Sequence, residues 1–380
     1  MKQIINSNEI QRAIARGLDY LCQCATTGKW HGFPTLAGES QTWVTGFILA
    51  HISSLVTKKE ERDVRQRAEA FLLSVRKSAG GWSYGEGVPA DADSTAWCIN
   101  ALSKSRRLTP SIKKQAERFI MSHRTGDGFS TYRLASGIGK FIRAKSDDSI
   151  AGWTSAHSDV TAAVLLAGMP TKESKDFKQI VADLVGKQSG AGFFDAYWWR
   201  GPLYTTTLIL RALSKQGFQL PKVKATLILR ALQREQLRGG GFSLGSSTEP
   251  DPFTTALGLE CFSHLTYLGG CDERRRVGSA LLECQQANGG WNGDYVMRIP
   301  SPSTVDPKLV GEWSRQGGGG NCYILDKGGL FATALSCYTL DCWRRAESHK
   351  GRGKVVTLRP SSAPERIMPD DVQEVQVTPS

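Results

Sequence analysis

A short motif that ends in glycine and an aromatic residue recurs six times along this chain of 380 residues. The closing aromatic residues are Trp30, Trp82, Phe129, Phe193, Phe242 and Trp291. Most successive motifs are about fifty residues apart, and the third interval is longer. A repeat of this length is typical of arrays in which each unit buries its apolar face against the next. The sequence therefore predicts six similar structural units.

Each motif is followed by a variable loop and then by an apolar segment that opens with hydroxyl residues. These segments are 40–52, 93–102, 159–168, 204–213, 252–262 and 330–340. They are apolar nearly all round, as expected of helices buried on every side. Amphipathic, charged segments lie between them, at 60–77, 109–123, 173–188, 221–236 and 271–286. The pattern predicts an all-α fold, an (α/α)6 barrel with inner and outer helix rings; an open α-solenoid is the alternative, and the uniformly apolar inner helices favour closure.

The repeat also sets the predicted domain limits. Residues 1–345 form one barrel, and residues 346–380 are polar, contain prolines and are expected to be disordered. The third and sixth loops are enlarged by 130–157 and 292–327. Because the loops and inner-helix N-termini meet at one rim, we expect a cavity there, with the long loops as lids or binding loops.

Composition limits the compartment and the partners. No apolar run reaches the length that spans a bilayer, and the N-terminus lacks a signal-peptide core, so we expect a cytoplasmic protein. The nine cysteines are scattered, without a CxxC pair, which favours free thiols. The net charge of +12 favours an anionic partner, which charge alone leaves open among nucleic acid, an anionic membrane surface and a phosphorylated substrate. The histidines show no metal-ligand spacing, so no metal site is expected.

Two aspartates stand at the start of the second inner segment, in "DADSTAW" (91–97). Burial and a neighbouring carboxylate both raise an aspartate's pKa, so Asp91 and Asp93 could keep one carboxylic acid protonated near neutral pH. A helix N-terminus acts in the opposite direction because it favours the anion. The alternative is that the pair simply caps the helix, since Asp is a favoured N-cap.

These motifs resemble those of a known superfamily. "QQANGGW", with Gln285, Gly289 and Trp291, fits the QxxxGxW repeat of the squalene–hopene and oxidosqualene cyclases. "DADSTAW" resembles the DxDD acid motif of class II terpene cyclases, and "DVTA" (159–162) resembles a second stretch of that family. The resemblance covers roughly residues 1–345. It implies a cyclase that protonates a terminal alkene or epoxide of a polyprenyl substrate and closes rings through a carbocation, without ionising a diphosphate.

The resemblance also implies roles for the acid residues. Asp93 would be the proton donor, Asp91, Ser94 and Thr95 would orient it by hydrogen bonds, and Asp159 would support it. The chain departs from the family at two positions: Ser94 replaces the fourth aspartate, and Ala163 replaces a histidine that hydrogen-bonds the acid. We expect His157 to substitute for that histidine.

Aromatic and basic residues are expected to bind the substrate, because π-faces stabilise cations. The aromatic candidates are Trp43, Trp97, Trp153, Trp198, Trp199, Tyr204, Phe253 and Phe331. Packing alone is the alternative for each of them. Arg200 is the candidate for holding a diphosphate, together with Arg133, Lys140, Arg143 and Arg298, and ordinary solvated surface is the alternative.

The expected partners follow from this chemistry. The substrate is a prenyl diphosphate or a squalene-like hydrocarbon, no cofactor is required, and Mg²⁺ would accompany only a diphosphate. Class II cyclases usually pair two barrels, so a homodimer, a second barrel or a peripheral membrane contact is expected to close the pocket; nucleic acid is not an expected partner. The alternatives are a non-catalytic prenyl- or lipid-binding barrel, a subunit of a two-barrel cyclase, and a glycan-active (α/α)6 enzyme that uses Asp91 or Asp93 with Asp159.

Overall fold

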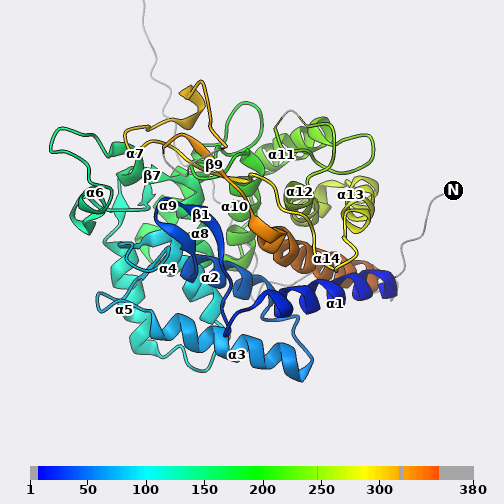
Figure 1. The fold of residues 1–380 in the computed structure, drawn as a ribbon. Coiled ribbons are helices and arrows are strands. Elements are labelled where there is room, and N and C mark those ends of the chain that lie inside the picture. The colour runs from blue at the N-terminus through cyan, green and yellow to red at the C-terminus, as the bar shows by residue number, and fades with distance from the viewer. Residues whose placement is uncertain (1–6, 246, 316–319, 351–380) are drawn as a thin grey trace, which may run out of the picture.

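The computed structural model describes residues 7–245, 247–315 and 320–350, and two rings of helices form its body (Figure 1). The inner ring consists of α2 (Thr42–Ile52), α4 (Ala92–Leu102), α8 (Ser158–Leu166), α10 (Pro202–Gln216), α12 (Pro252–His264) and α14 (Leu330–Lys350). The outer ring consists of α1 (Ser7–Cys24), α3 (Lys59–Ser74), α5 (Pro110–Met121), α9 (Lys175–Gly186), α11 (Lys222–Glu235) and α13 (Cys271–Glu283). All twelve alternate along the chain, as the repeat predicted.

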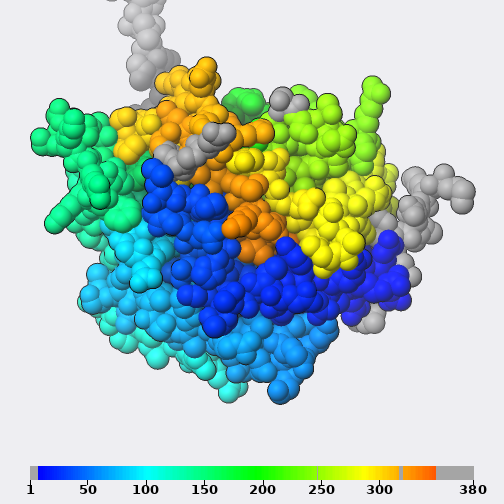
Figure 2. Space-filling view, viewed as in Figure 1, coloured from blue at the N-terminus to red at the C-terminus, as the bar shows by residue number. Residues whose placement is uncertain are grey.

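The inner ring is closed. Each inner helix contacts the next one in the chain, and α14 contacts both α12 and α2. The outer helix α1 packs on α14 and α3, so the beginning and end of the described chain lie side by side. Figure 2 shows this junction as blue residues directly against orange ones. The (α/α)6 barrel is therefore confirmed, and the open solenoid was the wrong alternative.

A threonine near the start of every inner helix accounts for the hydroxyl residues seen in the sequence. Its hydroxyl accepts a hydrogen bond from the backbone N–H of the preceding aromatic motif, as Thr95 does from Trp82 at 2.9 Å. The other pairs are Thr45 with Trp30, Thr161 with Phe129, Thr206 with Phe194, Thr255 with Phe242 and Thr333 with Trp291. In the fourth repeat the aromatic residue that makes this bond is Phe194. The prediction that Phe193 closes the fourth motif was therefore wrong by one position.

The sixth motif joins the last repeat to the first helix. Gln285 Nε2 donates to the carbonyl oxygens of Gly289 and Ala13, both at 2.8 Å. The Trp291 indole donates to the Leu281 carbonyl at 2.7 Å, which ties the motif to the end of α13. Gly289 has φ +91°, and a Cβ there would lie 2.6 Å from the Arg16 carbonyl oxygen. The glycine is therefore needed both for its backbone conformation and for the close approach to α1.

Gly289→Ala is expected to destabilise the protein by roughly 1–3 kcal/mol, because it adds backbone strain and a steric clash at the ring junction. Gly190→Ala is the matched control, since Gly190 lies in an equivalent motif and a Cβ there meets nothing within 4 Å. Urea denaturation followed by circular dichroism measures both. Equal midpoints for the two variants would contradict the role given to Gly289.

Short antiparallel pairs place the loops at the rim. They are β1 (Gly32–Thr35) with β2 (Gly38–Ser40), β3 (Trp82–Ser83) with β4 (Ala90–Asp91), β6 (Gly128–Ser130) with β5 (Arg124–Thr125) and β7 (Ala156–His157), and β8 (Met297–Ile299) with β9 (Cys322–Ile324). Helical turns in the loops are η1 (Leu134–Ser136), α6 (Ile138–Phe141), α7 (Ala151–Thr154), η2 (Thr266–Leu268), η3 (Pro307–Leu309) and η4 (Lys327–Gly329). Helix α14 continues five residues past the predicted tail boundary, and 351–380 of the predicted tail lie outside the described residues.

Candidate active site

One position is equivalent in all six inner helices, two residues before the threonine that binds the aromatic motif. Its occupants are Trp43, Asp93, Asp159, Tyr204, Phe253 and Phe331. Because the inner helices repeat the same geometry, these six side chains lie at one level near the N-terminal end of the barrel. We call them the mouth ring. It contains four aromatic side chains and two carboxyl groups, from the neighbouring helices α4 and α8.

Asp91 is a helix cap. It is the N-cap of α4, and its two carboxyl oxygens accept bonds from the Ser94 N–H and hydroxyl, both at 2.7 Å. Asp251 caps α12 in the same way, accepting from the Thr254 N–H at 2.7 Å and from its hydroxyl at 2.5 Å. Burial raises the pKa of Asp91 to about 7 and that of Asp251 to about 6. Ser94 was expected to orient Asp93; its hydroxyl bonds Asp91 instead.

Asp91→Ala and Asp251→Ala are each expected to cost about 1 kcal/mol of stability, because each leaves buried helix N–H groups without a cap. Asp91→Asn and Asp251→Asn keep the cap and are expected to cost less than the alanine variants. Thermal unfolding of the four variants at one pH measures this. A much larger loss for Asp91→Ala than for Asp251→Ala would show that Asp91 stabilises more than its own helix.

Asp93 is not a cap. It lies in the first turn of α4, and its Oδ2 accepts a hydrogen bond from the Trp43 indole at 2.8 Å. It keeps some exposure, whereas Asp91 and Asp159 are each only 2 % exposed. Burial and the nearby charges of Asp91 and Asp159 raise its pKa well above the usual range, and the Trp43 bond acts in the opposite direction. This environment favours the protonated form of the Asp93 carboxyl group over the carboxylate.

Asp159 holds a loop over the mouth. Its Oδ2 accepts from the backbone N–H groups of Tyr197 and Trp198 at 3.0 and 2.9 Å, and its Oδ1 accepts from Val160 at 3.0 Å. Arg298 also binds this loop, because its guanidinium donates hydrogen bonds to the carbonyl oxygens of Tyr197 and Ala196. Burial raises the pKa of Asp159, and the three N–H donors oppose that shift. Asp159 therefore acts on Asp93 through its charge, while its oxygens fix the loop.

The hydrogen bond of His157 goes to a neighbouring loop and not to Asp93. Its Nε2 bonds the Gly152 carbonyl oxygen at 2.8 Å, and its ring stacks on Tyr197 with centroids 3.6 Å apart. Burial lowers its pKa to about 3, so it is neutral at physiological pH. The expectation that His157 takes the place of the histidine missing at Ala163 was wrong, because its bonded nitrogen holds a loop carbonyl and the partner of Asp93 is Trp43.

Trp199 fills the centre of the mouth ring. It stacks on Tyr204 with centroids 3.7 Å apart and lies 5.3 Å from Phe253, 6.1 Å from Trp43 and 6.2 Å from Phe331. It comes from the loop that Asp159 holds, and it is 3 % exposed. The cavity predicted at the rim is therefore filled in this structure by aromatic rings.

A small cavity lies one to two turns deeper in the barrel. It is lined by Phe47, His51, Trp97, Tyr204, Thr207, Leu208, Arg211, Leu257 and Leu335. Its volume is about 10 Å³, room for about one water molecule. Pockets that hold small molecules typically measure about 300–1,000 Å³. A larger ligand therefore enters this barrel only if rings such as that of Trp199 move.

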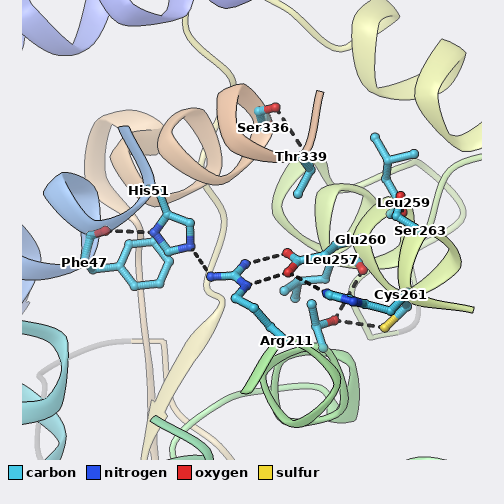
Figure 3. Close-up of polar contacts among 12 residues, drawn as sticks. Phe47, His51, Arg211, Leu257, Leu259, Glu260, Cys261, Ser263, Ser336 and Thr339 are labelled. Atoms are coloured by element: carbon cyan, nitrogen blue, oxygen red, sulfur yellow. Dashed lines mark hydrogen bonds and ion pairs between the residues drawn. The ribbon is translucent and has the colours of Figure 1, made fainter. Parts of the chain in front are cut away.

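A polar layer closes the far end of the barrel. Figure 3 shows Arg211 between His51 and Glu260. Arg211 donates to both Glu260 carboxyl oxygens at 2.5 Å and to His51 Nε2 at 2.7 Å, and it lies over the Tyr338 ring. Burial alone would raise the pKa of Glu260, but the Arg211 charge lowers it to about 2. Sequence reasoning missed this layer, because its four members stand singly on four different helices.

Comparison with known proteins concerns the fold. No protein-family model and no curated protein sequence matches the chain. Among solved structures, a variant of the type II terpene cyclase MstE from Scytonema, in complex with its substrate geranylgeranyl dihydroxybenzoate, matches with a TM-score of 0.79 and 23% identity. The match covers 89% of this chain and 98% of that one. The fold is that of a type II terpene cyclase.

Two further solved structures show how much of a longer or similar chain this barrel matches. A protein from Actinoplanes matches at a TM-score of 0.79 with 27% identity, over 88% of this chain and 99% of that one. The ent-copalyl diphosphate synthase from Streptomyces platensis matches at 0.54 with 15% identity, over 79% of this chain but only 50% of its own. The single barrel thus corresponds to nearly all of MstE and to half of the longer synthase.

The other predicted residues lie outside the mouth ring of the terpene-cyclase fold. Trp97 is one turn below Asp93 on α4 and lines the small cavity. Trp153 and Trp198 contact each other in the loop layer at 5.7 Å and donate their indole N–H groups to Pro300 and Thr131. Arg200 lies over the Tyr323 ring at 4.7 Å. Arg298, also considered for a diphosphate, has two of its nitrogens bonded to carbonyl oxygens.

No helix within 7–245, 247–315 and 320–350 is long and apolar enough to cross a membrane. Over the same ranges, no group of three or more His, Cys, Asp or Glu side chains is arranged to hold a metal ion.

Proposed function

We propose that this protein is a class II terpene cyclase that starts ring closure by protonating a polyprenyl substrate. The observation behind the proposal is Asp93, a carboxyl group with a strongly raised pKa in a mouth ring whose other members are four aromatic residues and Asp159. The second carboxyl group of the ring, on Asp159, is engaged by three backbone N–H groups. Asp93 is thus the ring member suited to give up a proton.

The chemical step transfers the Asp93 proton to the terminal alkene or epoxide. With an alkene, its π electron pair forms the new C–H bond, the neighbouring carbon becomes cationic, and Asp93 is left as the carboxylate. The cation then faces the aromatic rings around the mouth, whose π-faces stabilise positive charge while excluding water. Attack by the next double bonds closes the rings, and loss of a proton or capture of water ends the reaction.

The substrate class rests on the chemistry of the mouth and on the fold. The aromatic ring suits an apolar chain with several double bonds, and MstE, with the same fold, binds geranylgeranyl dihydroxybenzoate. A prenylated aromatic acid therefore joins prenyl diphosphates and squalene as a candidate. Binding requires Trp199 to leave the ring centre. We propose no resident cofactor; Mg²⁺ would arrive only with a diphosphate.

A polyprenyl substrate dissolves in lipid, so we also propose peripheral contact with a cytoplasmic membrane surface. Three apolar side chains of the loops support it, since Leu36 is 80% exposed, Leu134 75% and Leu309 84%. Burying these three exposed side chains against an apolar surface would be favourable. Sedimentation with phospholipid vesicles tests this contact, and triple replacement of the leucines by serine should reduce it.

The test of function is a product assay. Purified protein is incubated separately with geranylgeranyl diphosphate, farnesyl diphosphate, squalene and a geranylgeranylated dihydroxybenzoate, and diphosphates are removed before mass analysis. A cyclic isomer from one substrate, absent with Asp93→Asn, supports the proposal. Failure of all four, with a prenyl lipid still bound to the purified protein, would instead favour a binding barrel or a subunit that needs a second barrel. Release of sugars from glycans would favour the glycan-active alternative.

A further inference from the structure

We propose that Trp43 is the positioning residue of the acid: its indole N–H holds Oδ2 of Asp93 so that the transferable proton resides on Oδ1. The inference rests on the proposed function, because it concerns the same proton. Trp43 and Asp93 are equivalent members of the mouth ring on the adjacent helices α2 and α4. One ring member thus orients the next.

The chemistry of the two groups fixes the direction of the hydrogen bond. An indole N–H can only donate, so the Asp93 oxygen that it touches must accept. The distance of 2.8 Å from Trp43 Nε1 to Asp93 Oδ2 is that of a good hydrogen bond. A proton on Oδ2 would compete with the indole hydrogen for the same region. The carboxyl proton is therefore directed to Oδ1, the oxygen left for the substrate.

Packing holds the indole in place. Trp43 is 4% exposed, and its ring lies 5.3 Å from Phe33, 4.9 Å from Phe331 and 5.7 Å from Tyr84, with which it stacks. The Tyr84 hydroxyl in turn donates to the Phe33 carbonyl oxygen. Three neighbours on different segments therefore determine where the indole N–H points, and Asp93 receives a fixed donor.

The same bond has a second effect during the step. When Asp93 gives its proton to the alkene, it becomes a carboxylate, and a hydrogen bond to a charged acceptor is stronger than one to a neutral group. Trp43 therefore stabilises the product of the proton transfer and makes Asp93 a stronger acid. Unlike a histidine, the indole does not titrate in the physiological range, so it orients the acid without exchanging protons with it.

Two variants should move the titration of Asp93 in opposite directions. Trp43→Phe removes the N–H but keeps an aromatic ring, and it should raise the carboxyl pKa by about one unit, because a donor to the anion is lost. Asp91→Asn keeps the helix cap and removes a neighbouring charge, so it should lower the Asp93 pKa. Trp97→Phe, which deletes an indole on the same helix one turn below, should leave that pKa unchanged.

Infrared difference spectroscopy of the Asp93 carboxyl band, assigned with Asp93→Asn, measures these shifts in the protein without substrate. The same shifts should appear in the activity, whose high-pH limb moves up in Trp43→Phe while kcat at low pH falls about tenfold. An unmoved carboxyl titration in Trp43→Phe would overturn the inference, even if activity is lost. Shifted titrations in a protein that converts no substrate would instead leave Trp43 as the partner of Asp93 and reject the proposed function.

Discussion

Asp93→Asn is expected to lower product formation by at least about 10³-fold, because an amide cannot supply the proton that starts the reaction. General acid catalysis contributes typically about 10²–10⁴-fold, and a proton-initiated cyclisation has no other route to its first cation. The loss corresponds to about 4 kcal/mol in the barrier. It should appear in kcat with little change in KM, since asparagine keeps the shape of the carboxyl group and can still accept from Trp43.

The control for Asp93→Asn is Asp251→Asn. Asp251 is also buried, lies at the start of an inner helix and has a pKa raised to about 6, but it caps α12 and is not a ring member. Its variant should keep activity within a few-fold of the wild type. Equal losses in the two variants would mean that any buried carboxyl group at the rim matters, and Asp93 would lose its role as the acid.

Asp93→Asn should also change how the stability of the protein depends on pH. The pKa of folded Asp93 lies above that of an unfolded aspartate, so the folded state binds more protons and stability falls as pH rises above about 4. Asp93→Asn removes this penalty and should be at least as stable as the wild type at pH 7–8. Thermal unfolding at pH 5 and pH 8 tests the sign, and a variant that is less stable at pH 8 would show that the carboxylate is needed for folding.

The sequence was sufficient for the barrel because the determinants of the barrel recur. Six apolar inner segments, each with a threonine, and five charged outer segments are visible in the sequence, so an error such as Phe193 for Phe194 does not change the fold. The repeat also contained the mouth ring, since Trp43, Asp93 and Phe331 all stand two residues before their threonines. A comparison of that position across repeats would have separated Asp93 from the cap Asp91 without coordinates.

The sequence could not predict contacts that occur in one repeat only and have no equivalent in the others. The Trp43–Asp93 bond joins residues fifty positions apart and has no repeated counterpart. His157 was expected as the partner of the acid instead, because it stands two residues before Asp159. The filling of the mouth by Trp199 depends on a loop held by Asp159 and Arg298, whose path no local pattern determines. The polar layer at the far end of the barrel was missed for the same reason. Its Arg211 and Glu260 are each a single buried charged residue in a segment that is otherwise apolar.

Glu260→Gln is expected to destabilise the fold by about 3–5 kcal/mol, because it leaves the Arg211 guanidinium buried without its counter-charge. Arg211 is 9% exposed and Glu260 3%, and the cavity beside Arg211 has room for only about one water molecule, so solvent cannot replace the lost negative charge. The remaining acceptor, His51 Nε2, is neutral, since burial and the Arg211 charge lower the pKa of His51 to about 3. Urea denaturation at pH 7 measures the loss.

The pH dependence and a double variant distinguish a lost charge pair from general disruption of the core. Because the pKa of Glu260 is about 2 when folded, below its ordinary value, the stability that its charge provides is present above about pH 4.5 and is lost as pH falls toward 2. The difference between wild type and Glu260→Gln should therefore shrink on acidification. Replacing both Arg211 and Glu260 by methionine should restore much of the stability at pH 7, because a buried ion pair roughly balances its desolvation cost. A double variant as unstable as Glu260→Gln would show that the polar layer stabilises the base of the barrel through its shape and its bonds to His51, rather than through compensation of charge.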